Sequence, residues 1–458
     1  MESREPLRPN VLLIMADQFR ADHFGAAGAN FLRTPNLDRL AARGVLFRGC
    51  FTNSPVCAPA RIALASGLQP VRLGATDNRA FLPVRTPTYY QRLRDHAWRV
   101  GCVGKLDLAK PDGYNGRHGD RPCVYGWGFT HPCEAEGKMH AGNSAEPHGP
   151  YTFWLQERGL LARFHEDYRR RAAGGWNIGV CEDSVLPAEA FEDYWIGQRA
   201  AEWIETIPDD FPWHYFVSFV GPHDPFDPPA EYAEHTRDAA VPGAIPADGD
   251  GKPQWVRRRS RELDPDEVAV SRRQYGAAIA VIDEAVGKML DALERRGQLE
   301  TTFVLFTSDH GEMLGDHGLY AKSVMYEPAL RVPLLAAGPG IEGGRTSDAL
   351  VELIDVNPTI CELAGLPPQE NIDARSFAPV LRGEADAHRG EIVSQLTNCR
   401  CVRTERHKLI VNLNDAAELY DLAEDPDELH NVADEQPKTA AELRSRLGAR
   451  LLEDKWLR

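Results

Sequence analysis

The run NVLLIMADQ, residues 10–18, is a continuous apolar segment that ends in two polar residues, Asp17 and Gln18. Three more runs have the same form: WRVGCVGK over 98–105, HYFVSFVGPH over 214–223 and TTFVLFTSDHG over 301–311. A strand that is buried on both faces, as in a parallel sheet, carries apolar side chains at nearly every position. These four runs therefore predict the strands of a large, mostly parallel sheet.

Helical patterns separate the predicted strands. In TPNLDRLAARG, Thr34 is a typical N-cap, Pro35 suits the first helical position and Gly44 is a typical stop. Residues 274–297 carry one apolar stripe, formed by Ile282, Val286, Met289, Leu290 and Leu293. Strands that alternate with helices predict an α/β/α sandwich.

The pattern changes after residue 375. Short strand-like pieces follow, EIVSQL, CVRT and HKLIVNL, and a helical pattern runs from Thr439 onward. We therefore expect two domains. Residues 1–375 would form a catalytic α/β domain, and residues 376–458 a smaller domain of antiparallel sheet and helix.

The composition is that of a globular chain, with 43% hydrophobic and 26% charged residues. The net charge of -16 argues against nucleic acid and anionic membranes as partners. One basic segment stands out, WVRRRSRELD over 255–264, and such a charge run predicts a solvated helix face.

The sequence also bears on the cellular compartment. The N-terminal segment MESREPLRPN has no apolar stretch of the kind that forms a secretory signal, and the first apolar run is too short to span a bilayer. The nine cysteines are an odd number and are mostly scattered singly. We therefore expect reduced thiols and a cytoplasmic location.

Chemically active side chains stand where the predicted strands end. In open α/β sheets the functional crevice lies outside the carboxyl ends of the strands. Residues far apart in the sequence can therefore meet there, and the candidates are Asp17, Lys105, His223, Asp309 and His310.

The stretch NSPVCAPARIALASG, residues 53–67, places a lone cysteine, Cys57, at or just before the start of a predicted helix. Unpaired backbone N–H groups at a helix N-terminus favour negative charge, and Arg61 lies one turn further on the same side. From these residues alone, Cys57 is equally well a buried structural cysteine or a reactive thiolate.

The pentapeptide CAPAR matches Cys-x-Pro-x-Arg, the sequence that formylglycine-generating enzymes read, and here the chain resembles the sulfatase family. Three further segments carry the same resemblance: LLIMADQFRADHFG, the stretch SDHGEMLGDHGLYAKSVMYEPALRVPLL, and ELYDLAEDPDELHNVAD near the C-terminus. The resemblance implies the alkaline-phosphatase-like α/β fold. It also implies that a maturation enzyme oxidises Cys57 to formylglycine.

The resemblance further implies one divalent metal beside residue 57. By motif position its ligands would be Asp17, Gln18, Asp309 and His310. A set dominated by oxygen suits Ca²⁺, which we expect, or else Mn²⁺ or Mg²⁺. Many members of the family have two adjacent aspartates at this position. The Asp-Gln variant is similar to choline sulfatases and phosphonate monoester hydrolases, and it leaves the identity of the metal open.

The mechanism that the resemblance implies uses the two hydroxyls of hydrated formylglycine. One hydroxyl, beside the metal and Arg61, attacks sulfur, and the metal and nearby lysines neutralise the oxygen charges. A general acid, His223 or Lys322, protonates the leaving alcohol, and the second hydroxyl then expels sulfate. Matching positions add Lys105 to the catalytic residues and Asn78 as a substrate-binding residue.

The chain departs from the family pattern two residues after Lys105. Many sulfatases have a histidine there that helps to activate the formylglycine, whereas this chain has Asp107. An ionised aspartate cannot donate a hydrogen bond. Either His118, His140 or another residue takes the place of that histidine, or Asp107 acts as a base.

The sequence therefore predicts hydrolysis of an organic sulfate monoester, a small anionic substrate that a sulfated sugar would fit. The first alternative is a hydrolase of phosphonate monoesters or phosphodiesters, which the Asp-Gln element allows. A non-catalytic anion-binding relative is disfavoured because Cys57, Arg61, Asp17 and Asp309 are all present. A thiol or redox enzyme is disfavoured because the sequence contains no Cys-x-x-Cys.

Overall fold

The computed structural model describes residues 8–173, 181–247 and 251–453. Its main element is a seven-stranded sheet with the strand order β4-β5-β1-β6-β7-β2-β8. The four predicted strands are adjacent and parallel: β4 (Arg99–Gly104), β5 (Trp213–Pro222), β1 (Asn10–Asp17) and β6 (Thr302–Ser308). β7 (Leu334–Ala337) runs antiparallel to both of its neighbours, β6 and β2 (Gly44–Phe47), while β2 pairs in parallel with β8 (Arg345–Ser347). The predicted mostly parallel sheet is confirmed.

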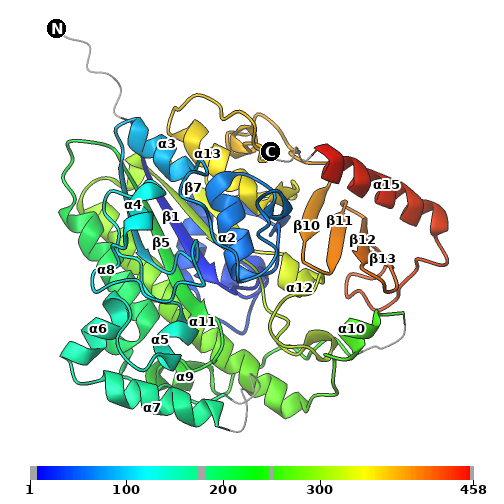
Figure 1. The fold of residues 1–458 in the computed structure, drawn as a ribbon, viewed down its shortest axis with the longest axis horizontal. Coiled ribbons are helices and arrows are strands. Elements are labelled where there is room, and N and C mark those ends of the chain that lie inside the picture. Colours follow the sequence, from blue (N-terminus) through cyan, green and yellow to red (C-terminus); the bar gives the residue numbers. More distant parts are fainter. Residues whose placement is uncertain (1–7, 174–180, 248–250, 454–458) are drawn as a thin grey trace.

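Helices cover both faces of this sheet, because alternate side chains of a strand point to opposite sides. On one side of β1, Leu12 and Ile14 pack into a core with α8 (Glu192–Thr206) and α11 (Pro265–Arg295). On the other side, Val11 and Leu13 pack into a second core with α2 (Cys57–Ser66), α3 (Tyr89–Asp95) and α13 (Val356–Leu363). The arrangement is the predicted α/β/α sandwich (Figure 1).

One predicted helix has the predicted bounds, a second begins earlier than predicted, and the basic run does not form a helix face. α1 (Pro35–Arg43) has the predicted bounds. α11 contains the predicted apolar stripe but begins earlier, at Pro265, where the Asp264 carboxylate accepts a hydrogen bond from the Asp266 amide at 2.8 Å. The basic run is not one helix face, because α10 (Gln254–Arg257) is a single short turn and the exposed residues Arg258 and Arg259 follow it.

The remaining elements are short or lie at the periphery of the sandwich. The helices are α4 (Pro122–Gly126), α5 (Lys138–Asn143), α6 (Pro150–Glu157), α7 (Leu161–Ala172), α9 (Ala230–Thr236), α12 (Glu327–Leu330) and α14 (Ala378–Leu381). Two further strands, β3 (Cys50–Phe51) and β9 (Val351–Glu352), form a small parallel pair.

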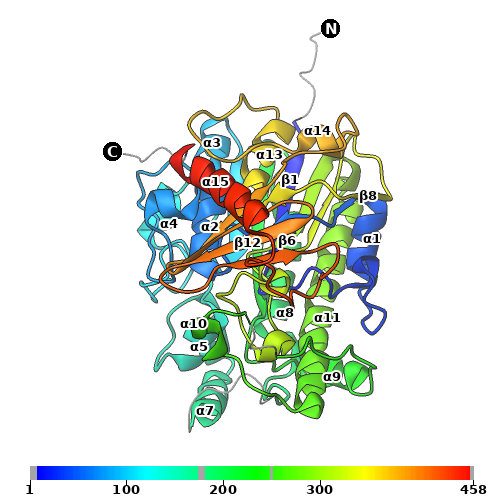
Figure 2. The ribbon, with the colours of Figure 1, turned by 90° about the vertical axis from the view of Figure 1, so that its right-hand side faces the viewer.

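The C-terminal segment forms a second, antiparallel sheet. Its strands are β10 (Ile392–Gln395), β11 (Cys399–Arg403), β12 (His407–Asn412) and β13 (Glu418–Asp421), and α15 (Pro437–Glu453) packs on it (Figures 1 and 2). The strand β13 was not predicted. Phe377 and Leu381 pack into the core on the α2 side of the large sheet. The division into two domains at residue 376 stays a prediction.

Among the described residues, no helix has both the length and the apolar character needed to cross a bilayer. Residues 1–7, which carry most of the N-terminal segment used to argue against a secretory signal, lie outside the described residues. The cytoplasmic location stays a prediction.

Candidate active site

Cys57 is the first residue of α2, as the sequence predicts, and every residue of this helix is buried. The residue before it, Val56, is extended and provides no side-chain cap. Asn78 provides one instead, because its Oδ1 accepts a hydrogen bond from the Ala58 amide at 3.1 Å. Residue 57 thus lies at the end of a helix that favours negative charge, and Asn78 lies beside it.

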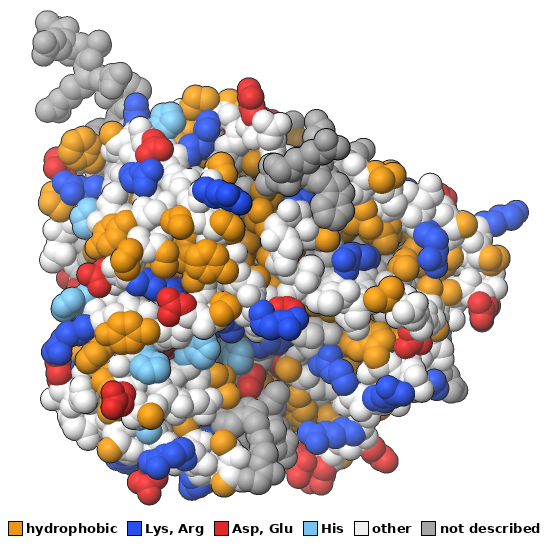
Figure 3. All heavy atoms as spheres, viewed as in Figure 1, with side chains coloured by type: hydrophobic (Ala, Val, Ile, Leu, Met, Phe, Trp, Pro, Cys, Tyr) orange, Lys and Arg blue, Asp and Glu red, His pale blue; other side chains and the backbone are white. Residues whose placement is uncertain are grey.

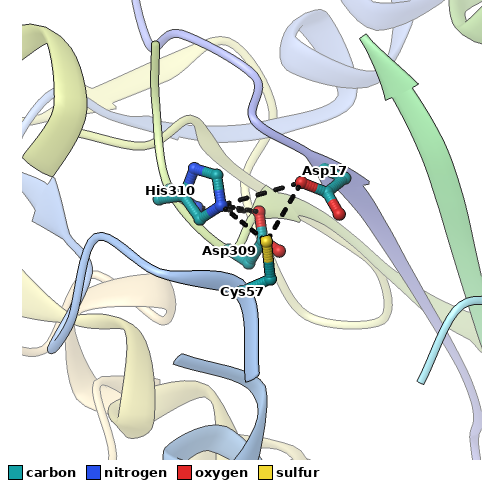
Figure 4. Close-up of side chains that lie close together, drawn as sticks. All are labelled: Asp17, Cys57, Asp309 and His310. Carbon is teal, nitrogen blue, oxygen red and sulfur yellow. Dashed lines mark hydrogen bonds and ion pairs between the residues drawn. The ribbon is translucent and has the colours of Figure 1, made fainter. Parts of the chain in front are cut away.

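Four buried side chains converge at this point (Figure 4). The ligand atoms of Asp17, Cys57, Asp309 and His310 all lie within 4.8 Å of one another. Cys57 Sγ is 3.2 Å from His310 Nε2 and 3.8 Å from Asp17 Oδ1. Asp17 ends β1, and Asp309 and His310 follow β6, so the convergence predicted from the strand ends is present.

The tautomer of His310 follows from its other ring nitrogen. His310 Nδ1 lies 2.9 Å from the carbonyl oxygen of Gly311, and a carbonyl oxygen only accepts hydrogen bonds. Nδ1 therefore carries the proton in the neutral ring, and the lone pair of Nε2 faces the cluster.

The donor set fits a divalent metal. Two carboxylates and one imidazole nitrogen converge in a site that excludes solvent. Carboxylate oxygens with one imidazole suit Ca²⁺, Mg²⁺ or Mn²⁺. The residues present therefore fit the metal that the family resemblance implies.

Gln18 lies beside this cluster, but its side chain has other partners. Its Oε1 accepts a hydrogen bond from the Lys322 ammonium, and its Nε2 donates to Glu312 at 2.6 Å. Its backbone amide contacts the cluster by donating to Asp309 Oδ1 at 3.0 Å. The role of the Gln18 side chain as a metal ligand stays a prediction.

Arg61 contacts residues that lie in, or directly after, four strands. Its Nε donates to Asp309 Oδ2 at 2.7 Å, and its Nη2 lies 3.5 Å from Asp17 Oδ2. Its Nη1 donates to the Lys105 carbonyl at 2.6 Å and to the Ser218 hydroxyl at 2.7 Å. Burial acts to lower the pKa of the guanidinium, but the facing carboxylates of Asp309 and Asp17 raise it above its usual range. Arg61 is therefore a fixed cation.

Lys105 directly follows β4 and is buried, whereas an ordinary surface lysine would be exposed. Its ammonium donates a hydrogen bond to Asp17 Oδ2 and lies 3.2 Å from Asp107 Oδ2. Burial disfavours the charged form, but Asp107 and Asp17 outweigh it and raise the pKa of Lys105 well above its usual range. The lysine therefore stays charged beside Cys57.

Asp107 is buried at the position where the family pattern has a histidine. Its Oδ2 also accepts a hydrogen bond from Lys110 Nζ at 2.5 Å, so the carboxylate lies between two ammonium groups. Burial acts to raise its pKa, yet Lys105 and Lys110 hold the pKa of Asp107 below its usual range. An ionised Asp107 of this kind is a partner for cations and not a hydrogen-bond donor.

The predicted acid candidates, His223 and Lys322, are in direct contact. Lys322 Nζ lies 2.6 Å from His223 Nε2, and His223 Nδ1 lies 2.8 Å from the carbonyl oxygen of Asp224. Nδ1 is thus the protonated nitrogen of the neutral ring, and Lys322 donates to Nε2. The two groups form one hydrogen-bonded pair that carries a transferable proton.

The surrounding cations act together on Cys57. Burial by itself raises the pKa of the thiol, but Lys105, Lys110 and Lys322 together outweigh it and hold that pKa well below its usual range. A negative charge at residue 57 is therefore favoured, which suits an anionic nucleophile or an anionic substrate oxygen.

A small cavity of ≈ 50 Å³ lies next to these groups. Its walls include Lys105, Asp107, Lys110, His140 and His223. On this face of the molecule, histidine, lysine and arginine side chains gather near α5 (Figure 3). Of the two histidines proposed as substitutes at position 107, His140 lines the cavity, whereas His118 is exposed and is not among its lining residues.

Sequence reasoning missed three participants. Lys110 follows Asp107 by three residues, Ser218 lies inside β5, and Glu312 follows the Asp309–His310 pair closely. Glu312 could have been found from the sequence, because it belongs to the SDHGE stretch. Lys110 and Ser218 had none, because nothing in their local sequence distinguishes them from a surface lysine and a core serine.

Comparison with known proteins gives a family for the whole chain. The model of the family described as Sulfatase matches residues 9–366. A second model, described as N-sulphoglucosamine sulphohydrolase, C-terminal, matches residues 315–455.

Individual relatives agree with the family models over nearly the full length. The choline-sulfatase of Rhizobium meliloti is 30% identical, over 93% of this chain and 83% of the relative. The N-acetylglucosamine-6-O-sulfatase of Bacteroides thetaiotaomicron is 25% identical, over 94% of this chain and 84% of the relative. The solved structure of the phosphonate monoester hydrolase of Agrobacterium radiobacter is similar with a TM-score of 0.80 and 25% identity, over 98% of this chain and 96% of that one.

Proposed function

The chain belongs to the sulfatase family, and from that premise we propose that it hydrolyses an organic sulfate monoester to an alcohol and sulfate. The nucleophile would come from residue 57. The observation that carries this proposal is the convergence of Cys57 with two buried carboxylates and His310, surrounded by the cations of Arg61 and Lys105.

Two groups would complete the site. A divalent metal, Ca²⁺ in the first place and Mn²⁺ or Mg²⁺ as alternatives, would be held by Asp17, Asp309 and His310, and would neutralise charge on the oxygens of the ester. Gln18 stays the predicted fourth ligand. Formylglycine made from Cys57 would supply, once hydrated, one hydroxyl to attack sulfur and a second to release sulfate.

The protein's own side chains would orient the ester and move a proton. Arg61 and Lys105 place fixed positive charge beside residue 57, where negative charge develops in the transition state. The Lys322–His223 pair would pass a proton to the departing alcohol. Lys322 is half-buried, and the negative charges of Cys57, Asp224 and Asp17 raise its pKa against the effect of desolvation, so the ammonium form is the one present.

We propose that Lys110 takes over the role of the histidine that the family pattern has at position 107. It lines the same cavity as Lys105 and His223, and it acts on the charge of residue 57. Asp107 would hold its ammonium at the cavity wall through the 2.5 Å contact. Asn78, which caps α2 beside Cys57, stays the predicted substrate-binding residue.

The maturation enzyme would have to act before this chain folds. Cys57 and Arg61 both belong to its recognition sequence, and both are buried in the finished structure. An enzyme that reads Cys-x-Pro-x-Arg therefore needs an unfolded or partly folded chain.

The leaving group is proposed to be a small alcohol, and a sulfated sugar is supported by the similarity to an N-acetylglucosamine-6-O-sulfatase. The test uses protein coexpressed with a formylglycine-generating enzyme and assays release of sulfate from 4-nitrophenyl sulfate and from N-acetylglucosamine 6-sulfate. Cys57→Ala is the control, because it keeps the fold of α2 but provides no nucleophile. Sulfate release that Cys57→Ala lacks supports the proposal, and no release from either ester would refute it.

A second candidate activity is hydrolysis of phosphonate monoesters or phosphodiesters. The Asp17–Gln18 element favours it, together with the likeness to the Agrobacterium phosphonate monoester hydrolase. The same enzyme preparation would be assayed with 4-nitrophenyl phenylphosphonate and bis(4-nitrophenyl) phosphate. A kcat/KM higher on these compounds than on every sulfate ester would replace the first proposal with this one.

A further inference from the structure

The basic run at 255–264 has no part in the site as described so far. Most of it faces solvent, as its composition predicts, and Arg257 and Arg258 are exposed. Arg259 differs from them in its contacts. Its Nη1 donates to the carbonyl oxygen of Ser323 at 2.9 Å, and its Nη2 donates to that of Lys322 at 2.7 Å.

The backbone that receives these two hydrogen bonds is itself unusual. The residues on both sides of Lys322, Ala321 and Ser323, have φ values of 65° and 67°. Residues other than glycine rarely adopt this left-handed backbone conformation, and it persists only where neighbouring contacts impose it. The segment around Lys322 therefore depends on its external hydrogen bonds.

Those hydrogen bonds come from several residues outside the segment, among them the Met313 amide, which donates to the Ala321 carbonyl at 2.8 Å. The Ala321 amide donates to Glu312 Oε1 at 2.6 Å, and the Ser323 amide donates to the carbonyl of Pro55, two residues before Cys57, at 3.1 Å. Arg259 binds the next two carbonyl oxygens of the segment, those of Lys322 and Ser323. With the backbone held in this way, the Lys322 ammonium lies 2.6 Å from His223 Nε2 and also donates to Gln18 Oε1.

We propose that Arg259 is a positioning residue that holds the Lys322 ammonium against His223, and so determines how well the pair donates a proton to the departing alcohol. The inference rests on the function proposed above, because the proton is donated in that reaction. Arg259 itself touches neither His223 nor residue 57 through any contact found in the described part of the chain. It acts through the backbone of Lys322.

Loss of the Arg259 contacts should change the rates of alkyl and aryl sulfate hydrolysis to different extents. Proton donation matters little for an acidic phenol such as 4-nitrophenol, which leaves readily as an anion. It matters much more for an alkyl alcohol, which leaves poorly without a proton. Misplacing Lys322 should therefore slow the hydrolysis of alkyl sulfates far more than the hydrolysis of aryl sulfates.

The experiment measures kcat and KM of the matured enzyme for 4-nitrophenyl sulfate and for an alkyl or sugar sulfate that the wild type cleaves. Arg259→Met removes both donors, Arg259→Lys keeps the charge but can reach only one carbonyl, and Arg258→Met is the exposed neighbouring control. For Arg259→Met we expect kcat on the alkyl ester to fall roughly tenfold or more, and kcat on the aryl ester to fall by less than about threefold. Arg259→Lys should be intermediate, and Arg258→Met should match the wild type.

Other outcomes would overturn the proposal. Equal losses on both esters would indicate a general structural role, and unchanged kinetics would show that Lys322 is held without Arg259. If Arg259→Met does not fold, Arg259→Lys alone must still show the larger loss on the alkyl ester. Failure of the proposed function is a distinct result, since the wild type would then cleave neither ester, and this inference would fall with it.

Discussion

Arg61 and Asp309 form a completely buried ion pair, in which Arg61 Nε lies 2.7 Å from Asp309 Oδ2. Arg61 comes from α2 and Asp309 directly follows β6, so the pair fixes α2, the helix that begins at Cys57, to the central sheet. The same guanidinium also contacts Lys105 and Ser218. The arginine of the Cys-x-Pro-x-Arg sequence thus assembles the site in addition to any role in maturation.

Replacing Arg61 should therefore destabilise the fold as well as the activity. Removing one partner of a buried ion pair leaves the other charge unpaired, and such changes cost about 3–5 kcal/mol. We expect Arg61→Ala to lower the free energy of unfolding by that amount in urea titrations. The control is Arg39→Ala, which removes partly exposed ion pairs with Asp291 and Glu294 and should cost about 1 kcal/mol or less. Equal losses in the two variants would show that the Arg61 network contributes little to stability.

Metal binding should be visible without any substrate. A ligand that binds only the folded state at 100 times its Kd stabilises that state by about 2.7 kcal/mol. We therefore expect added Ca²⁺ or Mn²⁺ to raise the Tm of EDTA-treated protein. Asp17→Asn and Asp309→Asn should each abolish the rise, because each removes one carboxylate of the cluster. A Tm rise that persists in both variants would place the cation elsewhere.

Lys110 should matter for catalysis although the family pattern does not include it. We expect Lys110→Met to lower kcat/KM for sulfate esters by about tenfold or more, because it removes one of the cations that act on residue 57. Lys288→Met, which removes a lysine of the α11 surface paired with Glu284, should have no effect. If Lys110→Met keeps full activity, His140 becomes the better candidate for the missing histidine.

Lowering the pH should reduce the free energy of unfolding, in part because Asp355 becomes protonated. This carboxylate accepts from Arg389 Nε at 2.6 Å and is completely buried. Burial acts to raise its pKa, but Arg389 and His388 lower the pKa to about 2. A carboxyl whose folded pKa lies below its ordinary value stabilises the fold above that ordinary value, and this contribution is lost as the pH falls toward 2.

The corresponding measurement is urea unfolding at several pH values between about 3 and 6, in the wild type and in Asp355→Asn. Asp355 should contribute about 2 kcal/mol at pH 6 and progressively less below pH 4. The free-energy difference between the two proteins should therefore shrink as the pH is lowered. A difference that stays constant with pH would mean that Asp355 titrates normally in the folded state.

The architecture was largely predictable because its strands are buried on both faces. The run that ends at Asp17 is apolar from Val11 to Ala16, and the run that ends at Asp309 is apolar from Phe303 to Phe306. The rule that crevices form at carboxyl strand ends brings Asp17 and Asp309 together. β13 escaped prediction because its pattern, ELYD, has only two apolar residues and a buried Glu418 whose carboxylate binds Tyr326 and Tyr420. Tertiary hydrogen bonds, not local pattern, place it in the sheet.

The candidate site was predictable only where a residue has a motif around it. Cys57, Arg61 and His310 were found in this way, and they lie together. The position of Lys110 in the site could not be predicted, because its ammonium is held by the buried carboxylate of Asp107. The backbone of Asp107 has a φ of 56°, which turns the chain in an unusual direction. The side chain of Gln18 could not be oriented either, since its partners Glu312 and Lys322 are distant in the sequence.

Conversion of Cys57 to formylglycine would be visible in the mass of the proteolytic peptide that contains residue 57. The peptide would be taken from protein coexpressed with a formylglycine-generating enzyme, with an established sulfatase matured in parallel as a positive control. We expect the mass of an aldehyde, or of its hydrate, in place of the thiol. A thiol in every copy of the peptide, alongside a fully converted control, would contradict this expectation.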